Sequence, residues 1–319
     1  MFKRETGLHF RIAGWVMKKH SSHLLILGTC IFCALPVFAD TIPDNRFNGN
    51  FIDIMSQQVR VYQTGSGEDI LLIHGLPGCI EDWETIIPEL SKKYRVTVYD
   101  RPGHGFSSAN ELKYNLEQNV DFAFALIDKL KLNNPVVVGH SYGGSIVVAM
   151  AVRNQPNVKA FVAVSPITSA KGQPDLIFRI LKIPAIGPAS VWLVKLLTGC
   201  SLVNKGLDRA FDPNQKDMPQ DFAGIRCMII SQQKMIKTSA HEEIALRTDV
   251  EKMMPLYGGI KKPLYIVHGE SDKAVPVTEG EALYKAVPGS KLTRLSDTGH
   301  MVQYAKPAEV IMVIDEAAR

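Results

Sequence analysis

The chain has 319 residues and a mass of 35.3 kDa, which is enough for one large α/β domain or two small ones. Hydrophobic residues make up 46% and charged residues 21%, a composition that excludes a disordered or collagen-like chain. The formal net charge of +4 resides in the first 39 residues, where five Lys and Arg face one acidic residue, because the remainder carries 31 of each sign. Because the chain after residue 39 has no net positive charge, it creates no overall electrostatic field that attracts phosphates. We therefore expect no nucleic-acid partner.

Residues 1–39 are predicted to be a secretory signal peptide, with Met17 as a candidate true start. An uncharged apolar stretch, Leu24–Leu35, follows two lysines and precedes small residues that end at Ala39. This order is typical of a signal that is cleaved after Ala39. The stretch is shorter than the roughly 20 apolar residues that span a bilayer. We therefore expect export, to the periplasm or the medium. The alternative is an uncleaved segment that anchors the chain to a membrane.

Short apolar, β-branched runs alternate with helical patterns along the rest of the chain. The predicted strands are Phe51–Met55, Gln58–Gln63, Ile70–Ile73, Val96–Tyr99, Pro135–Val138, Phe161–Val164, Leu264–Val267 and Lys291–Leu295. The predicted helices between them are Trp83–Tyr94, Leu116–Leu130, Ser145–Asn154 and Thr278–Val287. The first two runs indicate a hairpin, and the continuously apolar central runs are typical of parallel strands buried on both faces. This alternation predicts a doubly wound α/β sheet.

The stretch from about Thr168 to Gly258 shows helical patterns and no clear strand. We assign residues 168–256 to a helical insertion, a lid, and residues 40–167 and 257–319 to the α/β core. Within the insertion, Leu176–Leu197 is rich in large apolar residues but contains three basic residues and two prolines, which argues against a membrane-spanning helix. This segment is expected either to cover an apolar substrate pocket or to pack against the core.

The sequence Gly139-His140-Ser141-Tyr142-Gly143 lies between a predicted buried strand and an apolar helix. This is the G-x-S-x-G pattern, in which a serine on a strained strand-to-helix turn exposes its hydroxyl and the flanking glycines allow the turn. The pattern in this context makes Ser141 the candidate nucleophile.

With this segment the chain resembles the α/β-hydrolase family, in its lid-bearing serine hydrolase branch, over about residues 50–317. The likeness rests on the loop Ile73–Gly78 (IHGLPG), the segment Tyr99–Ser107 (YDRPGHGFS), the serine turn and a C-terminal acid and histidine. The resemblance implies the α/β-hydrolase fold: a mostly parallel eight-stranded sheet with helices on both faces and a helical lid after strand 6. Dehalogenases and epoxide hydrolases of this fold carry aspartate at the turn, so Ser141 implies attack on a carbonyl and an acyl-enzyme.

A serine hydroxyl is a weak nucleophile at neutral pH and needs a histidine base that a carboxylate orients. His300 follows the last predicted strand and matches the family's histidine loop, and Asp272 follows the strand before it. The chain order Ser141, Asp272, His300 is the order that this fold uses. Glu270 and Asp297 are the alternative orienting carboxylates.

The resemblance also implies an oxyanion hole made by the backbone N–H groups of Leu76 and Tyr142. No organic cofactor and no metal is expected, since His241-Glu242-Glu243 lacks the second histidine of a zinc motif. No G-x-G-x-x-G follows a strand, which leaves hydride transfer without support.

The remaining polar residues of these motifs are expected to have structural roles. His74 and His104 lie in Gly-Pro turns and should organise loops by hydrogen bonds, and Asp100 and Arg101 should fix the same turn. His140 neighbours the nucleophile, but adjacent side chains point apart, so we interpret it as structural.

Five cysteines are present, and Cys30 and Cys33 would leave with the signal peptide. The odd number that remains excludes a multi-disulfide framework. A bridge between Cys200 and Cys227 is compatible with an oxidising compartment, but buried free thiols are the favoured interpretation. Cys79 is expected to be a small core residue.

Together these features predict an exported serine hydrolase that cleaves a carboxylic ester with an apolar acyl or alcohol part. The alternatives are a lactone, an amide or iminopeptide, or the carbon–carbon bond of a diketone. A non-catalytic binding module of the same fold and a membrane-tethered lipid hydrolase are further alternatives. The expected partner is a small apolar molecule, and membrane contact is expected only through an uncleaved N-terminal segment or the lid.

Overall fold

The computed structural model describes residues 47–109, 114–170 and 200–319, which belong to a compact unit from Asn45 to Arg319. The predicted signal peptide and the apolar segment Leu176–Leu197 lie outside the described residues.

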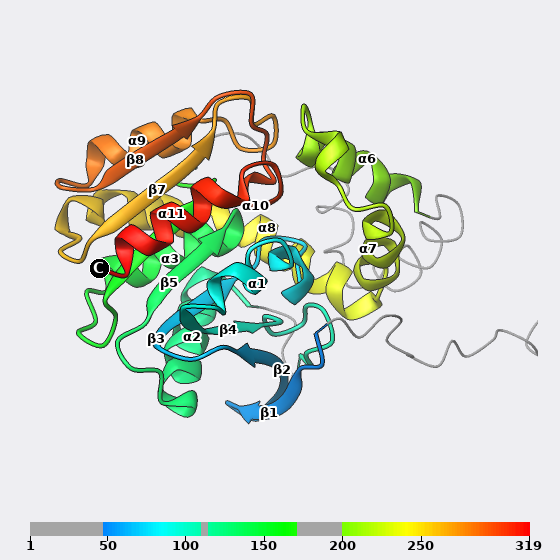
Figure 1. Cartoon of the computed structure of the whole chain (residues 1–319), viewed down its shortest axis with the longest axis horizontal. Helices are drawn as coiled ribbons and strands as arrows, with labels where there is room; N and C mark the ends of the chain where they lie inside the picture. Colours follow the sequence, from blue (N-terminus) through cyan, green and yellow to red (C-terminus); the bar gives the residue numbers. More distant parts are fainter. Residues whose placement is uncertain (1–46, 110–113, 171–199) are drawn as a thin grey trace, which may run out of the picture. The chain divides into compact units, whose positions relative to one another are not determined.

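Eight strands form one sheet in the order β1-β2-β4-β3-β5-β6-β7-β8 (Figure 1). Their bounds are β1 Asn50–Ile54, β2 Gln57–Thr64, β3 Glu68–Ile73, β4 Tyr94–Tyr99, β5 Val136–His140, β6 Ala160–Val164, β7 Leu264–Gly269 and β8 Lys291–Leu295. The β1–β2 and β2–β4 pairs are antiparallel and all other pairs are parallel. The predicted opening hairpin and the mostly parallel eight-stranded sheet are therefore confirmed.

Helices cover both faces of the sheet, which explains why every residue of β5 and β6 is buried. On one face, α2 (Leu116–Leu130), α3 (Tyr142–Val152) and α9 (Thr278–Ala286) contribute to one hydrophobic cluster. On the other face, α1 (Ile87–Leu90) and α11 (Pro307–Ala317) contribute to a second cluster. The doubly wound architecture follows from these two apolar layers.

The predicted helix Trp83–Tyr94 is wrong. The structure has a 3-10 turn, η1 (Ile80–Trp83), then the short α1, and β4 begins at Tyr94. Proline is tolerated in the first turn of a helix but not in its interior, and Pro88 accordingly stands at the start of α1. Two further helices, α10 (Val302–Ala305) and α11, were not predicted from the sequence, whereas α2 has the predicted bounds.

The described part of the chain between β6 and β7 is helical, as predicted. It contains α6 (Ser201–Phe211), η2 (Gln215–Asp217), α7 (Phe222–Ile230), α8 (Gln233–Met253) and η3 (Met254–Gly259), and no strand within residues 200–259. Helix α8 joins the core through Leu246, Val250 and Met253, which pack in the same cluster as α2 and α3. One end of the insertion is thus part of the main hydrophobic core.

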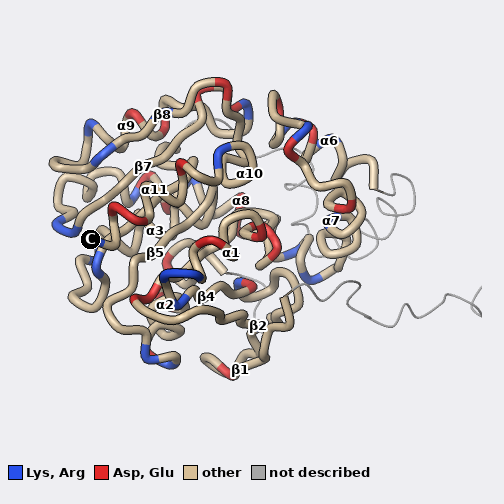
Figure 2. Tube along the Cα trace, in the orientation of Figure 1, with Lys and Arg blue, Asp and Glu red and all other residues tan. Residues whose placement is uncertain are grey.

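Basic and acidic residues are interspersed along the traced chain (Figure 2). None of the helices in the described ranges is both long and apolar enough to cross a membrane.

Cys200 and Cys227 form a disulfide that links the N-terminal cap of α6 to α7. The interpretation of this pair as free thiols is therefore wrong. The two cysteines are 27 residues apart in the sequence, and the folding of the insertion brings their Cα atoms to 5.4 Å. Cys79 is free and buried, as expected.

We expect one of the three cysteines after residue 40 to react with iodoacetamide in denaturant without reductant, and all three to react after reduction. The reason is that only Cys79 carries a free thiol. Mass spectrometry of the peptides identifies which cysteines are alkylated in each case. Alkylation of Cys200 or Cys227 without reductant would contradict the disulfide.

Candidate active site

Ser141 is the single residue between β5 and α3, and it has φ +55° and ψ −119°. A non-glycine residue in this region stores about 1–3 kcal/mol of strain and persists only where its surroundings enforce it. Here the Ser141 amide donates to the Val164 carbonyl at 2.9 Å, and the Ser141 carbonyl accepts from the Ser145 amide at 3.1 Å. These bonds hold the turn between a neighbouring strand and the first turn of the helix.

The glycines on either side of Ser141 are required by close backbone contacts. A Cβ on Gly139 would collide with the carbonyl of Gly143, and a Cβ on Gly143 would collide with the carbonyls of Ile73 and His74. The predicted reason for the G-x-S-x-G spacing is therefore confirmed in this structure. The same packing brings the His-Gly loop (residues 74–78) against the serine turn.

Asp272 and His300 meet at 2.7 Å, between the carboxylate Oδ2 and the imidazole Nδ1. The other carboxylate oxygen, Oδ1, accepts the amides of Ala274 and Val275 at 2.8 Å each. Burial raises the pKa of Asp272, but His300 and these hydrogen bonds outweigh burial and hold the pKa well below its ordinary value. Asp272 is therefore an anion that orients His300.

Of the carboxylates considered, Asp272 is the one in contact with the histidine. Glu270 instead pairs with Arg294 at the surface, at 2.7 Å. Asp297 has a left-handed backbone with φ +53°, and its carbonyl accepts a hydrogen bond from the Asn214 side chain.

His140, the residue before the nucleophile, contacts the histidine loop (residues 297–301). Its Nε2 lies 2.8 Å from the His300 carbonyl, and the two rings are 4.7 Å apart between centroids. A carbonyl only accepts, so Nε2 carries the hydrogen. Burial and the neighbouring His300 lower the pKa of His140 to about 3, so it is neutral at ordinary pH. Its role is structural, as predicted, but the contact with His300 was not visible in the sequence.

His268 is a buried neighbour of Asp272. It is fully buried, and its Nε2 donates to the Val275 carbonyl at 2.9 Å and lies 3.5 Å from Asp272 Oδ2. The sequence analysis assigned His268 no role. Its position at the end of β7, four residues before Asp272, is the signal that could have indicated one.

The predicted oxyanion donors lie on the two segments that meet at Ser141. Tyr142 begins α3 directly after the nucleophile, and Leu76 belongs to the His-Gly loop, where a Cβ on Gly75 would lie 3.1 Å from the Cβ of Ser141. Among the described residues, neither amide donates a hydrogen bond to another protein group. Both amides therefore have donor capacity for a ligand.

Arg101 connects these two segments. Its guanidinium donates to the carbonyls of His74 at 3.3 Å and Gly75 at 2.9 Å, and lies 4.7 Å from the centre of the Tyr142 ring. It also forms a fully buried ion pair with Glu242 of α8, at 2.6 Å. The sequence indicated that Arg101 fixes its turn but not that a residue of the insertion neutralises it.

Glu242 also accepts from the side chains of His104 and Asn119, at 2.9 and 2.8 Å. Burial raises the pKa of Glu242, but Arg101 and His104 outweigh burial and lower the pKa to about 2. Glu242 is thus a buried anion with three donor side chains, those of Arg101, His104 and Asn119. Each of them lies more than a hundred residues away in the sequence, so no local pattern indicates this role.

The other motif residues organise loops, as predicted. His74 accepts the Arg101 amide through Nε2 at 2.9 Å and donates through Nδ1 to the Gly75 carbonyl at 3.0 Å. Asp100 accepts the amides of Ile80 and Phe106 at 2.8 Å each. Within residues 47–109, 114–170 and 200–319, no group of His, Cys, Asp and Glu side chains is placed to hold a metal ion.

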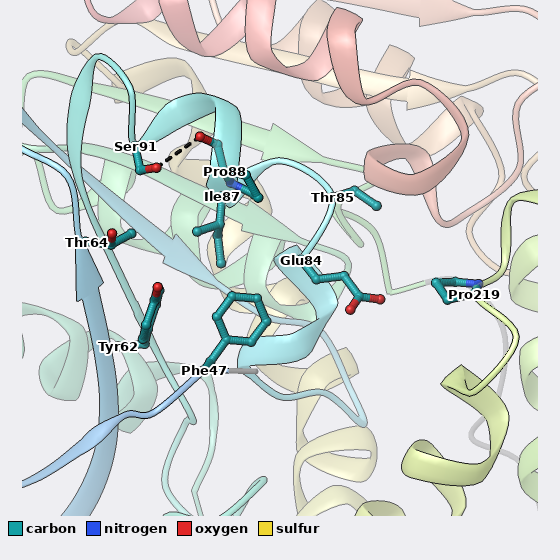
Figure 3. A pocket seen from close by; sticks show the side chains of 9 residues that line it. All are labelled: Phe47, Tyr62, Thr64, Glu84, Thr85, Ile87, Pro88, Ser91 and Pro219. Carbon is teal, nitrogen blue, oxygen red and sulfur yellow. Dashed lines mark hydrogen bonds between the residues drawn. The ribbon is translucent and has the colours of Figure 1, made fainter. Parts of the chain in front are cut away.

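The structure also has a hollow of about 560 Å³ (Figure 3). Its walls come from Phe47, from β2, from the segment around α1 and from Pro219 of the insertion, and Ser141, Asp272 and His300 do not line it. We therefore do not assign the catalytic chemistry to this hollow.

The family model described as alpha/beta hydrolase fold matches residues 70–307. The chain belongs to this family. The match contains Ser141, Asp272 and His300, and it confirms the resemblance and the fold class inferred from the sequence.

Relatives of this alpha/beta hydrolase extend over most of its length. The magnesium-chelatase 30 kDa subunit of Rhodobacter capsulatus is 28% identical over 250 residues, which cover 76% of this chain and 84% of the relative. The 2-hydroxy-6-oxo-2,4-heptadienoate hydrolase of Pseudomonas putida is 22% identical over 278 residues, with coverages of 81% and 92%. The crystal structure of the enol-lactonase from Burkholderia xenovorans LB400 has a TM-score of 0.70 at 23% identity and covers 85% of this chain and 100% of its own. The structural likeness shows the fold, and together with the family match and the related hydrolase it confirms the predicted enzyme class, a hydrolase.

The substitution Glu242→Gln should destabilise the protein by about 3–5 kcal/mol at pH 7, because it leaves the Arg101 charge buried without its partner. Glu242 has a folded pKa of about 2 against an ordinary value of 4.5. Its contribution is therefore fully present above pH 4.5 and is lost as the pH falls toward 2. Urea unfolding at pH 7, 4.5 and 3 should show a smaller loss of stability on acidification in the variant than in the wild type. If the free energy of unfolding fell by the same amount between pH 7 and pH 3 in both proteins, this assignment would be contradicted.

Proposed function

We propose that this protein is a serine hydrolase that cleaves a carboxylic ester through an acyl-enzyme, with Ser141, Asp272 and His300 as its catalytic triad. The observation that carries the proposal is the 2.7 Å contact between Asp272 and His300, on a loop that His140 attaches to the strained turn at Ser141.

The tautomer of His300 supports the role of a general base. A carboxylate only accepts, so His300 donates its Nδ1–H to Asp272. In the neutral imidazole this leaves Nε2 without a hydrogen and with a free lone pair. Nε2 then takes the proton of Ser141 as the hydroxyl oxygen attacks the substrate carbonyl, and Asp272 stabilises the imidazolium that forms.

The amides of Leu76 and Tyr142 are proposed to bind the oxyanion of the tetrahedral intermediate. Backbone donors that are already in place cost no reorganisation when the charge develops, and removal of one such donor typically costs about 3–4 kcal/mol. Arg101 donates to the Gly75 carbonyl, which shares a peptide plane with the Leu76 amide, so it helps to set the direction of that amide. The start of α3 sets the direction of the Tyr142 amide.

The second half of the reaction uses the same groups. Protonated His300 gives its proton to the leaving alcohol, which departs and leaves the acyl group on Ser141. Neutral His300 then takes a proton from water, whose oxygen attacks the acyl carbonyl, and returns that proton to Ser141 as the acid leaves. Atoms and charges balance without a metal or an organic cofactor.

An apolar small molecule is the proposed substrate. Met301, next to the base, packs in a hydrophobic cluster whose other buried members are Leu207, Phe211, Phe222 and Tyr304. The related hydrolase and the enol-lactonase make a vinylogous carbon–carbon bond and a lactone the second candidates, since the same nucleophile and base serve these bonds. An amide or iminopeptide has no specific observation in its favour.

Wild-type protein should hydrolyse p-nitrophenyl esters, and Ser141→Ala should lower kcat by at least about 10⁴-fold, because the substitution removes the nucleophile. A series of esters from acetate to palmitate, with release of p-nitrophenolate as the readout, tests the ester and apolar parts of the proposal together. Serine-dependent turnover of a lactone or a diketone but not of any ester would replace the substrate and keep the triad.

A labelled fluorophosphonate separates an enzyme from a binding module of the same fold. We expect covalent labelling of the folded wild type, and none of Ser141→Ala or of His300→Ala at equal protein concentration, since the reagent reports an activated serine. Folded wild-type protein that does not react would contradict the proposed enzyme.

We also propose that the chain is exported, to the periplasm or the medium. The charge and apolar pattern of residues 1–39 supports this proposal, and so does the Cys200–Cys227 disulfide, because such bonds persist in oxidising compartments. N-terminal sequencing of the protein expressed in bacteria should begin at Asp40. A protein that retains residues before Asp40 and stays with the membrane fraction would support the anchored alternative instead.

A further inference from the structure

The last residues of α6 and the turn that leads to η2 are hydrogen-bonded to the histidine loop. We call these residues, 210–214, the insertion turn. The carbonyl of Ala210 accepts both the His300 amide at 3.1 Å and the Met301 amide at 3.2 Å. The backbone of the proposed base is thus hydrogen-bonded to a residue of the helical insertion.

Asn214 makes two further bonds to the same loop. Its Oδ1 accepts the Gly299 amide at 2.8 Å, and its Nδ2 donates to the Asp297 carbonyl at 3.0 Å. A Cβ on Gly299 would collide with the carbonyl of Asp212. The two segments therefore approach so closely that only glycine fits at position 299.

The same turn also contacts the loop of the catalytic acid. Asp212 pairs with Lys273 at 2.7 Å, and Arg209, at the end of α6, donates to the Lys273 carbonyl at 3.2 and 3.0 Å. Lys273 directly follows Asp272. The ion pair is largely solvent-exposed and contributes little energy, whereas the Asn214 bonds engage backbone groups on both sides of Thr298, a residue that is fully buried.

We propose that Asn214 is a positioning residue for His300, and that the insertion thereby sets the geometry of the triad. The inference rests on the proposed serine hydrolase function. The loop from Asp297 to His300 carries a left-handed residue and a glycine, so its own backbone preference does not fix it, and Asn214 bonds to both of these residues. Displacement of a catalytic group by about 1 Å costs on the order of 100-fold in rate.

Asn154 provides a matched control. It too accepts one backbone amide, that of Lys261 at 2.8 Å, and its Nδ2 donates to the Gly259 carbonyl at 2.9 Å and to the nearby Val152 carbonyl at 3.2 Å. The bonds to Lys261 and Gly259 hold the chain just after η3, at the opposite end of the insertion. Asn154 follows the C-terminal end of α3, whose 11 residues extend about 16 Å from Ser141.

The test compares Asn214→Ala with Asn154→Ala on a p-nitrophenyl ester that the wild type turns over, together with the rate of fluorophosphonate labelling of each folded protein. We expect both variants to unfold at lower temperature. Only Asn214→Ala should lower kcat and the labelling rate, by about 10- to 100-fold, with KM changed less than twofold, because the histidine loop positions the base rather than the substrate.

Equal kcat and labelling rates for Asn214→Ala and the wild type would overturn this inference and leave the triad intact. Equal losses of kcat in both variants would also overturn it, because a general loss of stability would then explain the effect. A folded wild type that fluorophosphonate does not label would overturn the proposed function and this inference with it. Where Asn214→Ala does not fold, Asn214→Asp keeps the acceptor for Gly299 and removes the donor to Asp297, and it should show a smaller fall in the labelling rate in the same direction.

Discussion

Between β5 and α3 the chain reverses from extended to helical backbone at one residue, Ser141, with φ +55°. The rest of the site depends on this constraint. A turn of that kind is stable only where neighbouring groups enforce it, and here the carbonyl of Val164 and the packing of Gly139 against Gly143 do so. The close approach of Gly143 to the end of β3 then places the His-Gly loop beside the serine. One strained residue therefore determines which backbone segments can surround the nucleophile.

The described part of the insertion packs against the core and contributes to its stability. Helix α8 buries Leu246, Val250 and Met253 with the helices of the sheet, and its Glu242 neutralises a buried arginine of the core. The insertion turn binds the backbone of the histidine loop, and the disulfide ties α6, which leads into that turn, to α7. Sequence changes in the insertion can therefore affect the stability of the core and the geometry of the site separately.

The buried charges beneath the site are balanced locally. Arg101 and Glu242 are both fully buried, and each would be costly alone, because a charge in the interior must be paired and hydrogen-bonded. Their pairing allows a guanidinium to reach the carbonyls of the His-Gly loop and the ring of Tyr142 at once. His74, His104 and His140 have pKa values that burial lowers. They are therefore neutral hydrogen-bonding groups rather than additional buried charges.

The amino-acid sequence was sufficient to predict the features that depend on local pattern. Continuous apolar runs predicted the parallel strands, and the spacing of two glycines around Ser141 predicted the turn, because both are set by neighbours within a few residues. The acid and histidine were predicted from the resemblance to the α/β-hydrolase family, whose histidine loop and chain order Asp272 and His300 match. Tertiary structure alone decided the Cys200–Cys227 bridge, the neutralisation of Arg101 by Glu242 and the attachment of the histidine loop to Asn214. Each of these joins groups that lie far apart in the chain, and which partners meet depends on how the insertion packs on the core, which no local periodicity encodes.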